Sequence, residues 1–151
     1  MASLLSDELL ANIGRSAAPG KEIVTQRDIR KYSIATGQRL QKYLEGNEAP
    51  PMYYISLFWE LVELDQLMPD GVSSDDLIPE FPLKRAMAGG LKIDFHRPVY
   101  PGDWLIATRT LTDIYEKQGS GGPLIFYTVT MQVETEDGEA VVTEKATRIL
   151  R

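Results

Sequence analysis

The sequence predicts an α+β fold, in which a curved antiparallel sheet packs against one long buried helix. Apolar residues recur at helical spacing in the first half of the chain and at alternate positions in the second half. The segment from Met52 to about Gln66 begins with a run that is apolar on nearly every side, which is typical of a buried helix. Alternating segments joined by short turns follow from Met87 onward and predict antiparallel strands. Helices and strands therefore occupy separate halves of the chain, which is the α+β pattern.

Two short helices and a short strand precede the central helix. Thr25 precedes Asp28 in a pattern close to a capping box, so a helix is expected to begin after Thr25. Gly37 is suited to end that helix, and the Pro50-Pro51 pair is suited to open the central one. The elements predicted in this half are helices over residues 3–13, 25–37 and 52–66, and a short strand at 22–25.

Four long strands are predicted in the second half, over residues 87–96, 104–115, 124–133 and 140–149. Asp137-Gly138 is a hairpin signal between the last two strands. Before the first of them, residues 68–82 hold three prolines and an acidic pair, and we expect a surface loop there. Residues 1–151 are expected to form a single domain, because this length is typical of one.

Composition excludes several classes of function. The chain has no cysteine, which excludes disulfides, thiolate metal sites and cysteine nucleophiles. His96 is the single histidine, so the chain by itself cannot build a zinc site from two or three histidines. The net charge of -6 and the lack of a basic tail argue against nucleic-acid binding. No apolar stretch approaches the roughly 18 residues of a membrane span and no leader is recognisable, so we expect a cytoplasmic protein without a membrane anchor.

Candidates for acid/base chemistry are few. His96 and Asp94 lie on the polar side of the strand predicted over residues 87–96. Histidine is the side chain that titrates near neutral pH without perturbation, so His96 is a candidate general base or ligand contact. A partly exposed histidine at a strand end is the simpler interpretation, because a base also needs an orienting partner and a reacting atom within reach. Asp94 is likewise expected to be a solvated strand residue.

Two groups of side chains are candidates for ligand contacts. Aromatic residues on the central helix are candidates for lining an acyl tunnel, although such residues more often form a core, and these are Tyr53, Tyr54, Phe58 and Trp59. Basic residues around a glycine pair form a candidate anion site, and these are Lys84, Arg85, Lys92 and Arg97. The pair itself, Gly89-Gly90, would let a ligand approach the backbone closely. Because neighbours on a strand alternate faces, this basic cluster exists only if the fold brings its members together.

Motifs spread over nearly the whole chain resemble those of one family. The motifs are Val24-Thr25-x-x-Asp28-Ile29-x-x-Tyr32-x-x-Ala35-Thr36-Gly37, then Ala49-Pro50-Pro51, then Phe95-His96-Arg97-Pro98-x-x-Pro101-Gly102-Asp103. In this order they are similar to the MaoC-like hydratases, and more closely to the N-terminal domain of the FAS1-like dehydratase group. The resemblance implies a hotdog fold, which is a curved antiparallel sheet around one long helix. It also implies reversible addition of water to an enoyl-CoA thioester, with acyl-CoA as the substrate and with no metal or bound cofactor.

The chain departs from the family pattern where the chemistry takes place. In catalytic members of the family, Ala-Thr-Gly is followed by an aspartate and later by a histidine, which activate water. Here Gln38 follows Gly37, and no histidine comes between it and Ala49. Glutamine can orient a water molecule but cannot accept its proton. General acid/base catalysis contributes about 10²–10⁴-fold to a rate, and this contribution is missing from the motif.

These observations predict the non-catalytic subunit of a heteromeric enoyl-CoA hydratase. In two-domain relatives the acid/base pair lies on the second hotdog, so the resemblance implies a separate hotdog polypeptide as the partner. The residues expected to contact the acyl group are Tyr53, Phe58, Trp59, Gly89 and Gly90, and those expected to contact CoA are Arg85, Lys92 and Arg97. Two alternatives stay open: a stand-alone homodimeric hydratase or thioesterase that uses His96 or Asp94, and an acyl-CoA-binding hotdog without catalysis.

Overall fold

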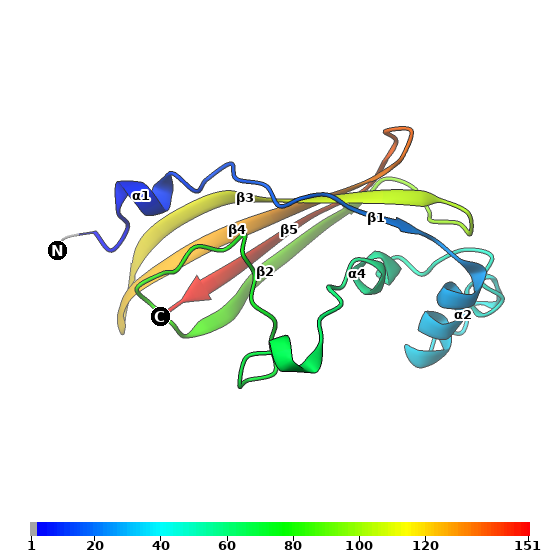
Figure 1. Ribbon diagram of the computed structural model, residues 1–151, viewed down its shortest axis with the longest axis horizontal. Coiled ribbons are helices and arrows are strands. Elements are labelled where there is room, and N and C mark those ends of the chain that lie inside the picture. The colour runs from blue at the N-terminus through cyan, green and yellow to red at the C-terminus, as the bar shows by residue number, and fades with distance from the viewer. Residues whose placement is uncertain (1–2) are drawn as a thin grey trace.

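A five-stranded antiparallel sheet with the strand order β1-β3-β4-β5-β2 is the centre of the fold. The computed structural model describes residues 3–151, and Figure 1 shows the sheet as a curved layer with α2 (Gln26–Ala35) and α4 (Tyr53–Leu57) on one side. We call this side the α4-facing side. The strands are β1 (Gly20–Ile23), β2 (Ala86–Phe95), β3 (Trp104–Gly119), β4 (Gly122–Thr135) and β5 (Ala140–Leu150). The predicted curved antiparallel sheet is therefore confirmed.

Local signals account for the helices. The backbone N–H of Asp28 donates to Thr25 Oγ1 at 3.1 Å, so Thr25 caps α2 as predicted. Gly37 follows that helix with φ of 69°, a left-handed conformation that glycine adopts without strain. The other helices are α1 (Asp7–Leu10), which is shorter than predicted, α3 (Gln41–Leu44), where the sequence predicts none, and the 3₁₀ helix η1 (Leu64–Gln66). None of the helices within residues 3–151 is long and apolar enough to cross a bilayer.

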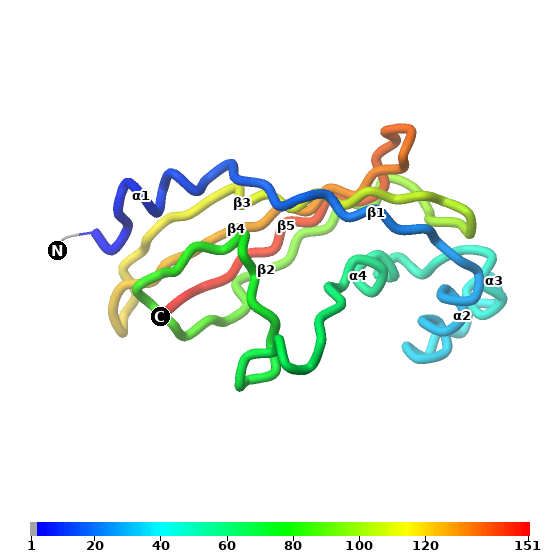
Figure 2. The backbone as a smooth tube through the Cα atoms, viewed as in Figure 1, coloured from blue at the N-terminus to red at the C-terminus, as the bar shows by residue number. Residues whose placement is uncertain are grey.

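The prediction of one long central helix over residues 52–66 is wrong. α4 ends at Leu57, and only its first turn is buried. Further along the predicted helix, Trp59 is 72% exposed and Leu61 is 95% exposed. Short helices owe most of their stability to packing of an apolar face, and these side chains stay in solvent instead of packing on the sheet. Figure 2 shows the chain leaving α4 through a long connection that stays on the α4-facing side until it enters β2.

Two apolar clusters lie on the α4-facing side of the sheet. The first packs α2 and α4 against one end of the sheet and includes Tyr54, Leu105 and Val142. The second lies under the connection from α4 to β2, where Leu77 and Phe81 are 3% and 5% exposed. The sequence predicts only a surface loop over residues 68–82. The structure shows that this segment also contributes buried side chains to the second cluster, where they pack on the sheet.

Candidate functional site

A row of four side chains crosses the sheet between the two apolar clusters. Arg109, Met131, Glu144 and Ile93 lie directly opposite one another on β3, β4, β5 and β2. The row before it along the strands contributes to the first cluster, and the row after it contributes to the second. Two charged residues thus interrupt an apolar surface, one contacted by α4 and the other by the connection that follows α4. We call these four residues the central row.

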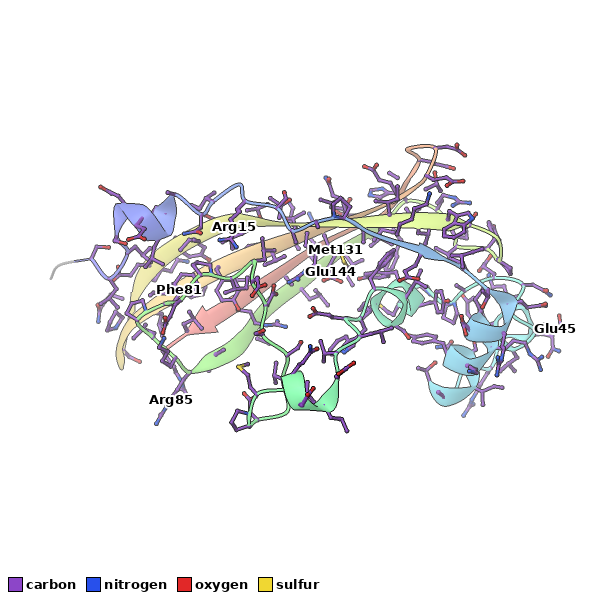
Figure 3. The ribbon with its side chains drawn as sticks, in the orientation of Figure 1. Arg15, Glu45, Phe81, Arg85, Met131 and Glu144 are labelled. Carbon is purple, nitrogen blue, oxygen red and sulfur yellow. The ribbon has the colours of Figure 1, made fainter. Side chains whose placement is uncertain are left out.

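Glu144 of the central row is held by a tyrosine of α4. The hydroxyl of Tyr54 donates to the carboxylate of Glu144, and Tyr54 is only 1% exposed. Burial, together with this hydrogen bond, raises the pKa of Tyr54 above its usual value, so the phenol stays protonated. The Phe95 ring lies edge-on to the Tyr54 ring, with centroids 6.4 Å apart. Figure 3 shows Glu144 beside Met131 in the middle of the sheet, on the strand next to it.

Arg109, at the other end of the central row, is engaged by the chain itself. Its guanidinium donates to both carboxylate oxygens of Asp75, over 3.3 and 2.6 Å. This two-pronged ion pair attaches the segment that carries Leu77 to the sheet. Glu144, by contrast, forms no ion pair within residues 3–151. The negative charge in the central row is therefore the one without a compensating cation.

Three arginines lie near the end of the β2–β5 pair along the backbone. The backbones of Arg85 and Arg151 exchange two hydrogen bonds, of 3.2 and 3.0 Å, and Arg148 lies three residues earlier on β5. Arg148 is opposite Tyr127 on the α4-facing side. Burial raises the pKa of Tyr127, and the positive charge of Arg148 offsets part of that rise. None of the three arginines forms an ion pair in the described part of the chain, so their charges are free to meet an anion.

The structure does not bring the predicted basic residues together. Lys92 lies on the face away from α4, directly opposite Lys145, where the two lysines line an open concavity with threonine side chains. Arg97 is bound to Asp103 at 3.2 Å and lies 3.7 Å from Glu139, so it stabilises the turn before β3. The separation follows from the alternation of side chains along a strand and from the turn that follows it.

The acid/base candidates also lie away from α4. His96 Nε2 is 2.9 Å from the hydroxyl of Thr143, and Asp94 is opposite Thr143 on β5. Both therefore face the side of the sheet that carries Lys92, not the side of the central row. Gln38, which follows Gly37 after α2, is half-buried and donates to Thr36 Oγ1 at 3.4 Å. No group of three His, Cys, Asp or Glu side chains that could hold a metal occurs in residues 3–151.

The predicted acyl-contact residues have different environments. Tyr53 is 2% exposed, and burial raises its pKa to about 12. Phe58 packs against the first apolar cluster, whereas Trp59 points into solvent. The Cβ of any larger residue at position 89 would lie 2.7 Å from the Ile149 side chain. Packing alone therefore accounts for a glycine here, without a ligand. Gly90 lies at the β-bulge of β2, with open space around it.

The sequence singles out Tyr54 only as a candidate for an acyl tunnel or for the core, and it does not single out Glu144 or Arg148. Tyr54 belongs to the apolar run of the central helix, and its position there gives no sign of a carboxylate partner. Glu144 and Arg148 alternate with Val142 and Ala146, which shows only that they share one face of the last strand. Which partner strands flank that face depends on sheet register, and a single sequence does not specify it.

Known proteins and a protein-family model are similar to this chain. The model of the FAS1-like, dehydratase domain region matches residues 11–144. The mesaconyl-C(4)-CoA hydratase of Chloroflexus aurantiacus is 33% identical over 85 residues, which is 56% of this chain and 30% of that protein. The chain thus aligns with less than a third of that relative's length.

Solved structures share the fold. The ChsH1-ChsH2 complex from Mycobacterium tuberculosis matches with a TM-score of 0.69 and 19% identity, over 95% of this chain and 89% of that one. The HadBC (3R-hydroxyacyl-ACP dehydratase) complex from the same organism matches with a TM-score of 0.63 and 19% identity, over 91% and 96%. The R-hydratase PhaJ1 from Pseudomonas aeruginosa matches with a TM-score of 0.60 and 18% identity, over 91% and 81%.

The family model covers most of the chain, and the similar solved structures share its fold. The chain therefore belongs to the FAS1-like dehydratase domain family, a group of MaoC-like hotdog proteins.

Proposed function

We propose that the chain is the non-catalytic subunit of a heteromeric acyl-CoA hydratase, in which it lines the binding site of the acyl group. The position of the family's aspartate holds Gln38, which cannot accept a proton. His96 and Asp94 lie on the face away from α4, so they do not replace the missing pair near the central row. The name of the Chloroflexus relative and the two-chain complexes among the similar structures support this assignment.

The proposal that the chain binds an acyl group rests on the position where α4 ends, which is nine residues before the predicted end at Gln66. Because α4 ends at Leu57, apolar side chains of the α4-facing side remain partly exposed next to the central row. Leu91 is 56% exposed and Phe95 is 49% exposed, while Ile93 and Met131 are half-buried. An acyl chain laid along these residues would remove apolar surface from water, which favours binding by about 25 cal/mol per Å² buried.

The outer edge of β2 supports the proposed hotdog partner. β2 is the last strand of the sheet order, and nine of its ten residues are classed as exposed. Three large apolar side chains are among them, Met87, Leu91 and Phe95. A long apolar edge strand left uncovered invites pairing with another strand. We therefore propose that the catalytic hotdog subunit binds along β2.

Hydration of crotonyl-CoA, followed as the loss of enoyl-thioester absorbance, tests the proposed function. The pure chain is expected to be inactive, and addition of a hotdog chain with the intact Asp and His motif, such as one encoded by a neighbouring gene, is expected to restore turnover. Robust turnover by the pure chain that is lost in His96→Ala would contradict the proposal. Binding of acyl-CoA without turnover in either preparation would instead favour a non-enzymatic acyl-CoA-binding hotdog.

The arginines at the end of the β2–β5 pair are proposed to bind the CoA phosphates, as the sequence predicts for Arg85. The double change Arg85→Ala with Arg148→Ala is expected to raise the Kd for free CoA about 10-fold at low salt, because phosphates form charge-assisted bonds with guanidinium groups. Titration calorimetry at two salt concentrations measures this change. Lys31→Ala on α2 is the matched control, since Lys31 is exposed and forms no ion pair. An unchanged Kd in the double variant would contradict the assignment.

A further inference from the structure

A shallow trough crosses the face of the sheet that lies away from α4. It is the open concavity that Lys92 and Lys145 line together with four threonines, and its volume is about 690 Å³. The threonines are Thr112, Thr128, Thr130 and Thr147, and we call the concavity the threonine trough. We infer that it binds the phosphoryl group of a small molecule other than CoA, between Lys92 and Lys145. The acyl group and CoA are proposed to bind elsewhere, so this inference goes beyond the proposed function and does not depend on it.

Lys92 on β2 and Lys145 on β5 form a cross-strand pair of like charges. They lie directly opposite each other in the register of the sheet, and both are exposed. The Cβ atoms of such a pair are about 5 Å apart, and like charges there destabilise a sheet. Neither lysine forms an ion pair within residues 3–151, although acidic residues outnumber basic ones by 22 to 16 in the chain. An anion between the two ammonium groups would remove this repulsion.

The acidic side chains nearest to this pair on the same face lie at the edges of the trough. Asp94 is two residues from Lys92 on β2, which is about 7 Å along the strand. Asp113 lines the trough from β3, two strands from Lys145, which is at least about 10 Å across the sheet. Exposed charges about 10 Å apart are largely screened by salt. The trough therefore has a positive end at the lysines and a negative end at Asp113.

Threonine hydroxyls supply a hydrogen-bond donor beside the lysines. Thr112 Oγ1 donates to the backbone oxygen of Thr128 at 3.3 Å and lies 2.9 Å from Thr130 Oγ1, so Thr130 is the donor in that pair. The hydroxyl oxygens of Thr128 and Thr147 are 2.9 Å apart, and one hydroxyl hydrogen suffices for the bond between them. The other hydrogen of this pair has no acceptor within residues 3–151, so it is available to a ligand.

Gly90 keeps the trough open next to the lysines. It lies directly opposite Thr147, at the β-bulge of β2, and a Cβ there would meet no atom within 4 Å. Its φ of 152° is a conformation that residues with a side chain rarely adopt. The row next to Lys92 and Lys145 thus has no side chain at its β2 position, which leaves room for a phosphoryl group beside the Thr128–Thr147 pair.

A phosphoryl group matches these donors in charge and in number. A phosphomonoester carries about −1.5 to −2 charges at pH 7 and three strong acceptor oxygens. These suit two lysine ammonium groups, which bind phosphate as compact point charges, and one hydroxyl. A carboxylate has one charge and two oxygens, so it would leave part of the lysine repulsion uncompensated. At the other end of the trough, Asp113 and the threonines favour an uncharged, hydroxylated remainder, as in a sugar phosphate.

Calorimetry with the full chain at low salt tests the inference with inorganic phosphate, glucose 6-phosphate and glucose. We expect both phosphate-containing probes to bind and glucose not to bind. Tighter binding of glucose 6-phosphate identifies a phosphomonoester as the occupant, and tighter binding of inorganic phosphate identifies the free anion. Lys92→Gln with Lys145→Gln is expected to raise either Kd about 10-fold or more, because hydrogen bonds to charged groups correspond to about 10- to 100-fold in affinity.

Lys31→Gln with Lys117→Gln is the matched control. These two lysines are exposed, form no ion pair within residues 3–151 and lie outside the trough. The control removes the same charge from the chain, so it weakens unspecific attraction of anions equally. Thermal unfolding without ligand checks that both variants fold. The variant at Lys92 and Lys145 is expected to be at least as stable as the wild type, because it removes a pair of like charges.

Three results would overturn the inference. The first is the absence of binding of inorganic phosphate and glucose 6-phosphate at millimolar concentration. The second is an equal rise of Kd in the two double variants, which would show unspecific attraction only. The third is a preference for CoA over dephospho-CoA that disappears in Lys92→Gln with Lys145→Gln, because the occupant would then be the 3′-phosphate of CoA. Failure of the chain to bind acyl-CoA contradicts the proposed function alone and leaves this inference in place.

Discussion

Tyr54→Phe is expected to lower the free energy of unfolding by about 2 kcal/mol, while Tyr53→Phe is expected to raise it by about 1 kcal/mol. The two tyrosines are adjacent in α4 and are 1% and 2% exposed. The hydroxyl of Tyr54 binds the Glu144 carboxylate, and its loss leaves that charge without its donor. The hydroxyl of Tyr53 is buried and has no hydrogen-bond partner within residues 3–151, so its removal relieves a desolvation cost.

Urea unfolding of the two variants at neutral pH measures this difference. The comparison is controlled internally, because each change removes one oxygen atom from a buried ring in the same helix. The double variant Tyr53→Phe with Tyr54→Phe is expected to equal the sum of the two effects within about 0.5 kcal/mol, since the hydroxyls share no partner. A loss of stability in Tyr53→Phe as large as that in Tyr54→Phe would show that the Tyr53 hydroxyl has a bonding partner after all.

Gly46→Ala is expected to lower the free energy of unfolding by about 3 kcal/mol. Gly46 has φ of 74°, and a Cβ there would lie 2.6 Å from the backbone oxygen of Gln26 and 2.8 Å from Arg30 Cγ. The left-handed conformation costs an alanine about 1–2 kcal/mol. The close contact adds about 1–3 kcal/mol, because a backbone oxygen at the start of α2 cannot move aside as a flexible side chain can.

Gly37→Ala separates these two contributions. Gly37 has φ of 69°, but a Cβ there would meet no atom within 4 Å. Its substitution is therefore expected to cost about 1 kcal/mol, from backbone conformation alone. Thermal and urea unfolding of both variants give the comparison. Equal losses at the two positions would show that the α2–α3 contact adjusts around the new methyl group, and that backbone conformation accounts for the whole effect.

The features of the candidate site that the sequence predicts are those that depend on residues close together along the chain. The motif around Gln38 shows that the family's acid is replaced, and the sequence alone suffices for this point. The role predicted for Arg85 stays a prediction, and in the fold its backbone pairs with Arg151, near Arg148, instead of lying beside Lys92 and Arg97. The pairing of Tyr54 with Glu144 spans 90 residues, and no local pattern encodes it.

The sequence by itself determined where the chain alternates, where α2 begins and that glutamine follows Ala-Thr-Gly, because these properties depend on residues close together along the chain. Thr25 caps its own helix three residues away, and the strand periodicity after Met87 is visible in any window of a few residues. The tertiary structure alone decided that α4 ends at Leu57 and that Glu144 lies opposite Met131 and Ile93. An apolar segment forms a buried helix only over the residues that pack against another surface. The register of a sheet depends on contacts between strands that are far apart in the sequence.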